Sequence, residues 1–168
     1  MLKEKNGAKV TAIIVGESSV EPVIRKALAI GADEAVRINM KPLDSYSTAK
    51  EISNYVNENP FDLIIAGKES SDYNGGAVPG MIADMLDLPF ANACNGLEID
   101  GNEVTLNREI DGGIEKIKSS LPIIIGGQKG LVEESELRIP NMRGIMTARS
   151  KPLNNIEVNN PTIMSESI

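Results

Sequence analysis

The sequence predicts an α/β fold: a mostly parallel sheet with helices on both faces, plus antiparallel strands after residue 90. Up to that point, short apolar runs rich in Ile and Val alternate three times with stretches that have the spacing of an amphipathic helix. After Pro89 the pattern changes to extended segments separated by turn residues such as Asp100-Gly101-Asn102. A chain of 168 residues is also long enough to bury one ordinary core.

The first strand–helix pair follows a short charged helix that ends at Gly7. Ala8–Val15 is the predicted strand, and Ser18 or Ser19 is expected to cap the next helix, over Val20–Ile30. The predicted buried face of that helix consists of Val23, Ile24, Ala27, Leu28 and Ile30.

The second pair begins with a predicted strand over Glu34–Ile38. Ser45 or Ser47 is expected to open the following helix, which runs to about Asn59 before Pro60 ends it. Its predicted inner face consists of Ala49, Ile52, Ser53 and Val56. We expect the first, second and third strands to form one parallel sheet.

The third pair contains the most polar loop of the chain. The strand Asp62–Ala66 leads through Gly67–Gly76 into a helix over Ala77–Leu86. Such a loop brings free backbone N–H groups and the positive end of a helix dipole together, which favours a phosphate. The spacing matches neither Gly-x-Gly-x-x-Gly nor Gly-x-x-x-x-Gly-Lys-Ser/Thr, so an ordinary strand–helix loop fits it equally well.

The remaining chain is predicted to be mainly extended. Its expected strands are Ala91–Ile99, Glu103–Ile110, Ile114–Ser119 and Leu121–Ile125. They predict a mixed sheet with an antiparallel edge, or a small second sheet. Pro140–Arg149 has the spacing of a short helix. We therefore expect a single nucleotide-binding-type domain over 1–150 and an extended C-terminal arm over 151–168.

Composition excludes several classes of function. A net charge of −7 repels phosphate backbones, and 3% aromatic residues leave few rings for base stacking, so nucleic-acid binding is not expected. The sequence contains no apolar run long enough to cross a membrane and no secretory signal at its N-terminus, which predicts a cytoplasmic protein without membrane insertion. With no His, and with Cys94 as the single cysteine, neither a Ser–His pair nor a disulfide can form. Cys94 is predicted to be a core thiol, and the chain is predicted not to be an enzyme.

Arg108-Glu-Ile-Asp-Gly-Gly-Ile-Glu115 has two interpretations. It is either a charged hairpin with a Gly-Gly turn or a polar edge that meets a partner subunit. Glu109 and Asp111 are two residues apart and are expected on one face of a strand, without a cation or His beside them. That arrangement argues against acid–base catalysis.

The segment Leu137–Pro152 also has two interpretations. Met142 between Asn141 and Arg143 suits an exposed docking element, because a flexible methionine adapts to varied surfaces. Alternatively, the segment starts a helix whose apolar residues face the core; these are Ile139, Met142, Ile145 and Met146.

Five segments in order along nearly the whole chain carry a resemblance to a known family. They are Val10–Gly16, Lys26–Asp33 (an "ALAxGAD" segment), Asp62–Lys68 ("DLxxxGK"), Arg108–Glu115 with Leu121-Pro122, and Arg143–Pro152 (similar to "RGIMKAKKKP"). The chain resembles the β subunit of electron transfer flavoprotein, and the last two segments are the specific ones.

This resemblance implies a Rossmann-like fold of the adenine nucleotide alpha hydrolase type. It implies an electron-carrier subunit that pairs with an FAD-carrying α subunit as a heterodimer. The pair would take electrons from acyl-CoA-type or other flavin dehydrogenases and pass them to a quinone reductase or a ferredoxin-like chain. A structural AMP is expected in the β subunit, or a second FAD in electron-bifurcating members.

The resemblance also assigns candidate sites. Cofactor binding is expected at Val15, Gly67, Lys68, Glu69, Ser70, Ser71, Asp72, Tyr73, Asn74, Gly75, Gly76, Ala77 and Val78. Partner docking is expected at Glu109, which would face the flavin domain of the α subunit, and at Asn141, Met142 and Arg143. Met142 would be the anchor that inserts into the dehydrogenase.

The chain departs from the family pattern in three respects. The family's first strand and part of its C-terminal arm have no counterpart here, so we expect marginal stability alone or rescue by oligomerisation. Thr147 and Ser150 stand where the family has lysines, and the loop Asp72-Tyr-Asn-Gly-Gly76 is unusual. The alternative function is a stand-alone adenine-nucleotide-binding module of universal-stress type, which would be a colourless homodimer with AMP or ATP.

Overall fold

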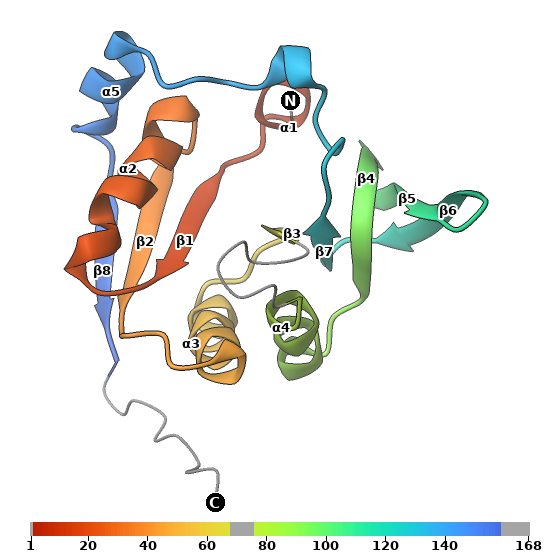
Figure 1. Ribbon diagram of the computed structural model, residues 1–168, viewed down its shortest axis with the longest axis horizontal. Coiled ribbons are helices and arrows are strands. Elements are labelled where there is room, and N and C mark those ends of the chain that lie inside the picture. Colours follow the sequence, from red (N-terminus) through yellow and green to blue (C-terminus); the bar gives the residue numbers. More distant parts are fainter. Residues whose placement is uncertain (1, 68–75, 159–168) are drawn as a thin grey trace, which may run out of the picture. The chain divides into compact units, whose positions relative to one another are not determined.

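The computed structural model describes residues 2–67 and 76–158, and it confirms the predicted α/β class. Helices and strands alternate up to residue 90, and strands dominate after it (Figure 1). The helices are α1 (Leu2–Asn6), α2 (Glu21–Ile30), α3 (Ser45–Glu58), α4 (Val78–Leu86) and α5 (Met142–Ala148), with 3-10 turns η1 (Ser18–Val20) and η2 (Glu134–Glu136). The strands are β1 (Thr11–Val15), β2 (Glu34–Asn39), β3 (Leu63–Gly67), β4 (Phe90–Asp100), β5 (Glu103–Ile110), β6 (Gly113–Ser120), β7 (Ile123–Gly127) and β8 (Leu153–Glu157).

The chain forms two compact units, which are described separately. The first unit runs to Leu43 and resumes at Arg138, and the second covers Asp44–Leu137. From Arg138 onward the chain belongs to the first unit again, and this stretch supplies α5 and β8 to it. Part of the predicted C-terminal arm is therefore a strand of a sheet. The predicted division into a domain over 1–150 and an arm over 151–168 stays a prediction.

The first unit is built on a parallel sheet in the order β1-β2-β8. The expectation that the first three strands share one sheet is wrong for the third, because β3 pairs with β7 in the other unit. An apolar β-branched run shows that a strand is buried but not which strand it pairs with. That choice depends on contacts between distant segments.

One face of this sheet is covered by α2, with α5 beside it (Figure 1). The core between them is aliphatic, and its buried members are Ile24, Leu28, Ala32, Ala35 and Ala148. Val23 and Ile30, predicted to face the core, are exposed on the outer side of α2. The predicted Ser18 or Ser19 cap is also wrong: Val20 precedes α2 and no side chain caps it. Both serines lie at the 3-10 turn that leads into the helix.

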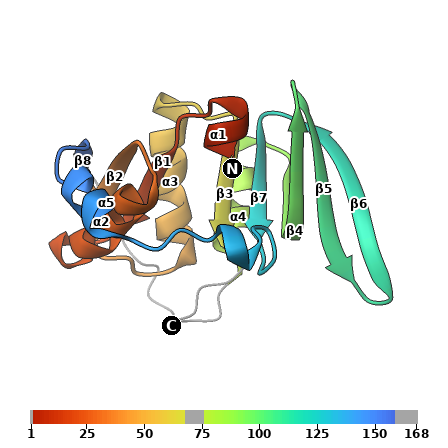
Figure 2. The same ribbon diagram turned by 90° about the horizontal axis from the view of Figure 1, so that it is seen from above.

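The second unit has a mixed sheet in the order β3-β7-β4-β5-β6 (Figure 2). The pairs of β7 with β3 and with β4 are parallel, whereas β4, β5 and β6 form an antiparallel meander. This confirms the expected change of pattern near residue 90. Ile124 packs with residues of α3 and α4, and its neighbours Ile123 and Ile125 belong to a second apolar cluster. The alternation follows from the period of two along a strand.

Helix α3 begins at Ser45, one of the two serines expected to open it, and it carries a capping box. Asp44 is the N-cap, and its side chain accepts a hydrogen bond from Ser47 N. The Ser47 hydroxyl accepts in return from Asp44 N at 3.2 Å. Two of the helix's free N–H groups are thereby satisfied. The predicted inner face of α3 is confirmed, with Ala49, Ser53 and Val56 buried.

Candidate functional site

The candidate nucleotide segment of the second unit is flanked by a strand and a helix, as predicted. Strand β3 ends at Gly67, which is exposed. Gly76 and Ala77 are exposed, and Val78 is the half-buried first residue of α4. The candidates between these ends, residues 68–75, lie outside the described part of the chain. Their role in binding stays a prediction.

The N-terminus of α4 is suited to an anion. Ala77 occupies the N-cap position, and its own side chain makes no capping hydrogen bond. Its backbone φ and ψ of −84° and −30° are ordinary for any residue. Pro79 fills the first turn without an N–H group of its own. The remaining backbone N–H groups and the helix dipole favour a phosphate oxygen at this end.

Val15, the candidate of the first unit, is the last residue of β1 and is half-buried. The chain then turns at Gly16 toward η1 and α2. Gly16 N donates to Ile38 O at 3.0 Å, so the turn is tied to β2. A side chain at Gly16 would also collide with Val20, since a Cβ would lie 2.6 and 2.8 Å from its two methyl carbons. Glycine is required here by close packing, and its φ is not positive.

The candidate docking residues lie at the start of α5. Asn141 is the N-cap, and its side-chain oxygen accepts a hydrogen bond from Gly144 N at 2.7 Å. Met142 is 75% exposed, and Ile139, Ile145 and Met146 are exposed as well. The core-facing interpretation of these residues is therefore wrong. The helix instead contacts α2 through Gly144 and Ala148.

Glu109 lies near the end of β5, opposite Ile114 of β6, and is exposed. In the same hairpin Arg108 forms an ion pair with Glu115 across the two strands. Asp111 lies in the turn between the strands rather than on β5. The charged hairpin predicted from the sequence is confirmed, and its exposed tip carries the apolar side chains of Ile110 and Ile114.

Cys94 is fully buried in β4, as predicted for a core thiol. Burial raises the pKa of its thiol above the usual value, which disfavours the reactive thiolate. Within residues 2–67 and 76–158, no cluster of three or more His, Cys, Asp or Glu side chains could hold a metal ion. None of the helices in those ranges is long and apolar enough to span a membrane.

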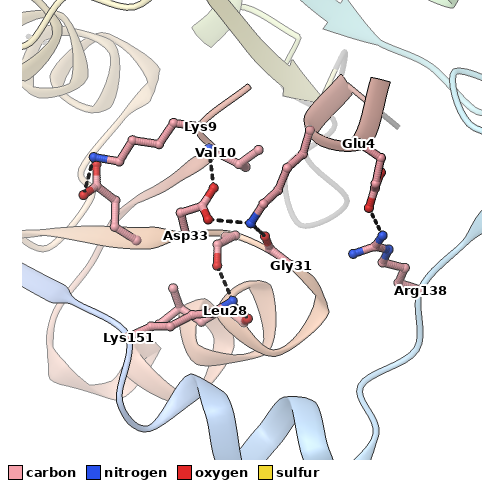
Figure 3. Close-up of polar contacts among 11 residues, drawn as sticks. Glu4, Lys9, Val10, Leu28, Gly31, Asp33, Arg138 and Lys151 are labelled. Carbon is pink, nitrogen blue, oxygen red and sulfur yellow. Dashed lines mark hydrogen bonds and ion pairs between the residues drawn. The ribbon is translucent and has the colours of Figure 1, made fainter. Parts of the chain in front are cut away.

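A polar cluster that the sequence did not predict joins two of the resemblance segments at the C-terminal end of α2 (Figure 3). Lys151 Nζ donates to Leu28 O at 2.9 Å and to Ala32 O at 2.6 Å. Leu28 lies in the last turn of α2 and Ala32 just beyond the helix, so the cation also suits the negative end of the helix dipole. The lysine that precedes Pro152 therefore anchors the chain after α5 onto α2.

Asp33 joins the same end of α2 to the N-terminal segment. Its carboxylate accepts a hydrogen bond from Lys3 and another, at 2.9 Å, from Val10 N (Figure 3). Lys3 Nζ also donates to Gly31 O at 3.2 Å. The hydrogen bond from Lys3, and then that from Val10, hold the pKa of Asp33 below its usual value. Nearby, Arg138 pairs with Glu4 of α1.

Replacing Asp33 by Asn is expected to lower stability by up to about 1 kcal/mol at neutral pH, since the charged pair is partly exposed. A carboxylate whose folded-state pKa is lowered contributes stability above its unfolded pKa, and this contribution disappears as the pH falls through the folded-state pKa. The difference between Asp33→Asn and wild type should therefore vanish in acid. Urea unfolding between pH 2 and pH 7 measures it, with the exposed Asp62→Asn as the control. A difference that persists unchanged at the lowest pH would contradict the assignment.

Comparison with known proteins agrees with the segments identified above. The family model described as "Electron transfer flavoprotein domain" matches residues 1–161. The chain is 38% identical over 161 residues to the electron transfer flavoprotein subunit beta of Bacillus subtilis (strain 168), covering 94% of this chain and 62% of that protein. It is 36% identical over 155 residues to the protein of that name from Syntrophomonas wolfei, covering 90% and 60%. It is 34% identical over 155 residues to a probable electron transfer flavoprotein subunit beta of Schizosaccharomyces pombe, covering 89% and 59%.

The chain thus spans about three fifths of the length of these curated relatives. The match over residues 1–161 includes both specific segments, the hairpin around Glu109 and the stretch that ends at Pro152. The chain belongs to the electron transfer flavoprotein domain family.

Proposed function

We propose that this chain is the β-type subunit of an electron-transferring heterodimer. The match of the electron transfer flavoprotein domain over residues 1–161 carries the proposal. The partner is an α-type subunit that carries the FAD, and the pair takes electrons from flavin dehydrogenases in the cytoplasm. The chain itself holds AMP in a structural role and catalyses no reaction. A second FAD in place of AMP is the alternative occupant of the same site.

The local geometry of α4 supports a bound adenine nucleotide. A phosphate placed at the N-terminus of α4 would accept hydrogen bonds from the backbone N–H groups of its first turn. Gly67 at the end of β3 and Gly76 before the helix offer backbone without side chains, so a ligand can approach closely. These features belong to the ends of the segment that the sequence singled out for phosphate.

The central test is co-expression of this chain with an α-type subunit, followed by purification of the complex. We expect a yellow heterodimer with a flavin absorption spectrum, and AMP in the supernatant after denaturation. A colourless homodimer under every condition would contradict the proposal and favour the stand-alone nucleotide-binding module. A yellow complex that releases only FAD would contradict the structural AMP alone.

Replacing Ala77 by Asp places a negative charge where the phosphate is proposed to bind. We expect AMP affinity to fall about tenfold, as two like charges about 4 Å apart near a surface repel by more than 1 kcal/mol. The fold should persist, because an acidic residue suits the N-terminus of a helix. Isothermal titration with AMP measures the effect. Ala77→Asn, of the same shape but neutral, is the matched control, and equal loss in both variants would argue against a phosphate at this helix.

Replacing Met142 by Ala is expected to slow electron transfer from a flavin dehydrogenase about tenfold, because an exposed apolar anchor is lost from the proposed docking surface. AMP content and thermal stability should remain unchanged. Stopped-flow reduction of the heterodimer's FAD measures the rate. Val23→Ala, which truncates an exposed apolar residue of α2 in the same unit, is the control. Equal slowing by both variants would exclude a specific role of Met142.

A further inference from the structure

Strand β1 forms one end of the parallel sheet in the first unit (Figure 1). At the end of the strand, Gly16 N donates to Ile38 O at 3.0 Å, so the backbone N–H of Gly16 points toward β2. Because the backbone groups of alternate residues point to opposite sides of a strand, those of Thr11, Ile13 and Val15 point away from β2. In the described part of the chain, no strand pairs with β1 on that side.

The free edge of β1 lacks the features that keep exposed strand edges apart. Thr11–Val15 contains no charge and no proline, and Val10 before it is an exposed apolar residue. At the other end of the same sheet, β8 exposes the polar side chains of Asn154, Asn155 and Glu157. Charged residues and proline on an edge strand prevent its pairing with another chain. The edge of β1 is therefore suited to receive a further strand.

One antiparallel register of β1 with a second copy of itself uses all three outward-facing residues. Centred on Ile13, it pairs Thr11 of each copy with Val15 of the other. The same register places Lys9 of each copy opposite Glu17 of the other. Glu17 still has extended backbone, with φ −68° and ψ 177°. Centring the pair one residue earlier or later would leave an outward-facing residue unpaired and lose the match of charges.

The charges at both ends of the strand are available for this contact. Lys9 and Glu17 are both exposed. Lys9 Nζ lies 2.9 Å from Glu34 Oε2, yet the Lys9 side chain is 68% exposed and can approach a second carboxylate. Opposite charges that face each other across antiparallel strands stabilise the pair. Because the two ends of the same segment complement each other, they favour a second copy over an unrelated strand.

We propose that two copies of this chain associate through β1 as an antiparallel, two-fold symmetric pair centred on Ile13. The two parallel sheets β1-β2-β8 then form one continuous sheet across the axis. This contact is made by the chain alone, so it goes beyond the proposed electron transfer and does not depend on it. A dimer of the isolated chain does not contradict that function, which the yellow complex with an α-type subunit decides separately.

Cysteine cross-linking of the full chain tests the register. In a hydrogen-bonded antiparallel pair the two Ile13 Cα atoms lie about 5.5 Å apart, a distance that a disulfide spans. We expect Ile13→Cys to form a disulfide-linked dimer under mild oxidation, measured by non-reducing gel electrophoresis. Thr11→Cys is the matched control, because in this register it faces Val15 of the other copy instead of its own counterpart. Native Cys94 does not compete, since it is fully buried.

Sedimentation equilibrium measures the dissociation constant of the dimer in wild type and charge variants. Ile13→Lys places two like charges at the axis and is expected to weaken the dimer by at least about a hundredfold. Ile156→Lys puts the same charge on an exposed residue of β8, at the opposite edge of the sheet, and should change the constant by less than about twofold. Glu17→Lys makes both end contacts repulsive and should weaken the dimer about tenfold, against about threefold for the neutral Glu17→Gln.

Several results would overturn the inference. The first is a wild-type chain that stays monomeric at every concentration reached, which would leave the edge to a different protein. The second is a dimer that Ile65→Lys dissociates and Ile13→Lys does not, because the contact would then use the uncharged edge of β3 in the second unit. Equal cross-linking of Ile13→Cys and Thr11→Cys also contradicts the register. If Ile13→Lys does not fold, Glu17→Lys decides the question, since Glu17 is exposed and lies outside β1.

Discussion

Replacing Leu28 by Ala is expected to destabilise the first unit by about 2–5 kcal/mol. Leu28 is 1% exposed and lies at the centre of the cluster that joins α2 to the parallel sheet, beside Ile24 and Ala35. Its removal leaves a cavity that a backbone held by β-sheet hydrogen bonds cannot readily fill. Urea unfolding followed by circular dichroism measures the loss.

Val23→Ala is the matched control, because Val23 lies on the same helix and is 56% exposed. Its effect is expected within about 0.5 kcal/mol of zero. The sequence predicted both residues on the buried face, so the pair also tests the orientation of α2. Similar losses in the two variants would show that the helix is rotated from the described orientation.

Replacing Gly144 by Ala is expected to destabilise the protein by about 1–3 kcal/mol. A Cβ at Gly144 would overlap the carbonyl oxygen of Ala29, a backbone atom of α2 that cannot rotate away. Alanine favours a helix by about 1 kcal/mol over glycine, so a loss of stability would directly reveal the close helix crossing. Because α5 carries Met142, the proposed docking role of that residue also predicts slower electron transfer from a flavin dehydrogenase.

Gly80→Ala provides the comparison for this change. Gly80 lies inside α4, and a Cβ there would meet Phe90 at 3.5 and 3.9 Å, which is ordinary contact. This variant should be neutral or more stable by up to about 1 kcal/mol. Thermal unfolding of both variants measures the contrast. Equal effects of the two alanines would contradict the close approach of α5 to α2.

Much of the candidate site was predictable because its signals are local. Gly67 and the start of α4 were placed from an apolar run, a glycine-rich loop and a helical spacing. The docking role of Asn141–Arg143 was expected from the resemblance and stays a prediction, and the exposure of Met142 excludes only the core-facing interpretation. Residues 68–75 keep the role that the sequence assigned to them, as a prediction.

Arg37 and Lys151 were not singled out because their partners are distant in sequence. Arg37 donates to Gly16 and to Asn155, and Lys151 donates to Leu28, more than 100 residues earlier. A charged residue in a strand and a lysine before a proline carry no local sign of such partners. The pairing of β2 with β8 brings Asn155 to Arg37, and the pairing of β2 with β1 brings Gly16 to it.

The sequence by itself determined the identity of the strands and helices other than β8, the change to antiparallel pairing near residue 90, and the family resemblance, because residue spacing and turn chemistry act within a few positions. The tertiary structure decided which strands pair, so that β3 joins β7 instead of β1 and β8 completes the first sheet. It also decided which face of α2 is buried and what Arg37 holds. These outcomes depend on contacts between segments far apart in the chain, which local patterns do not specify.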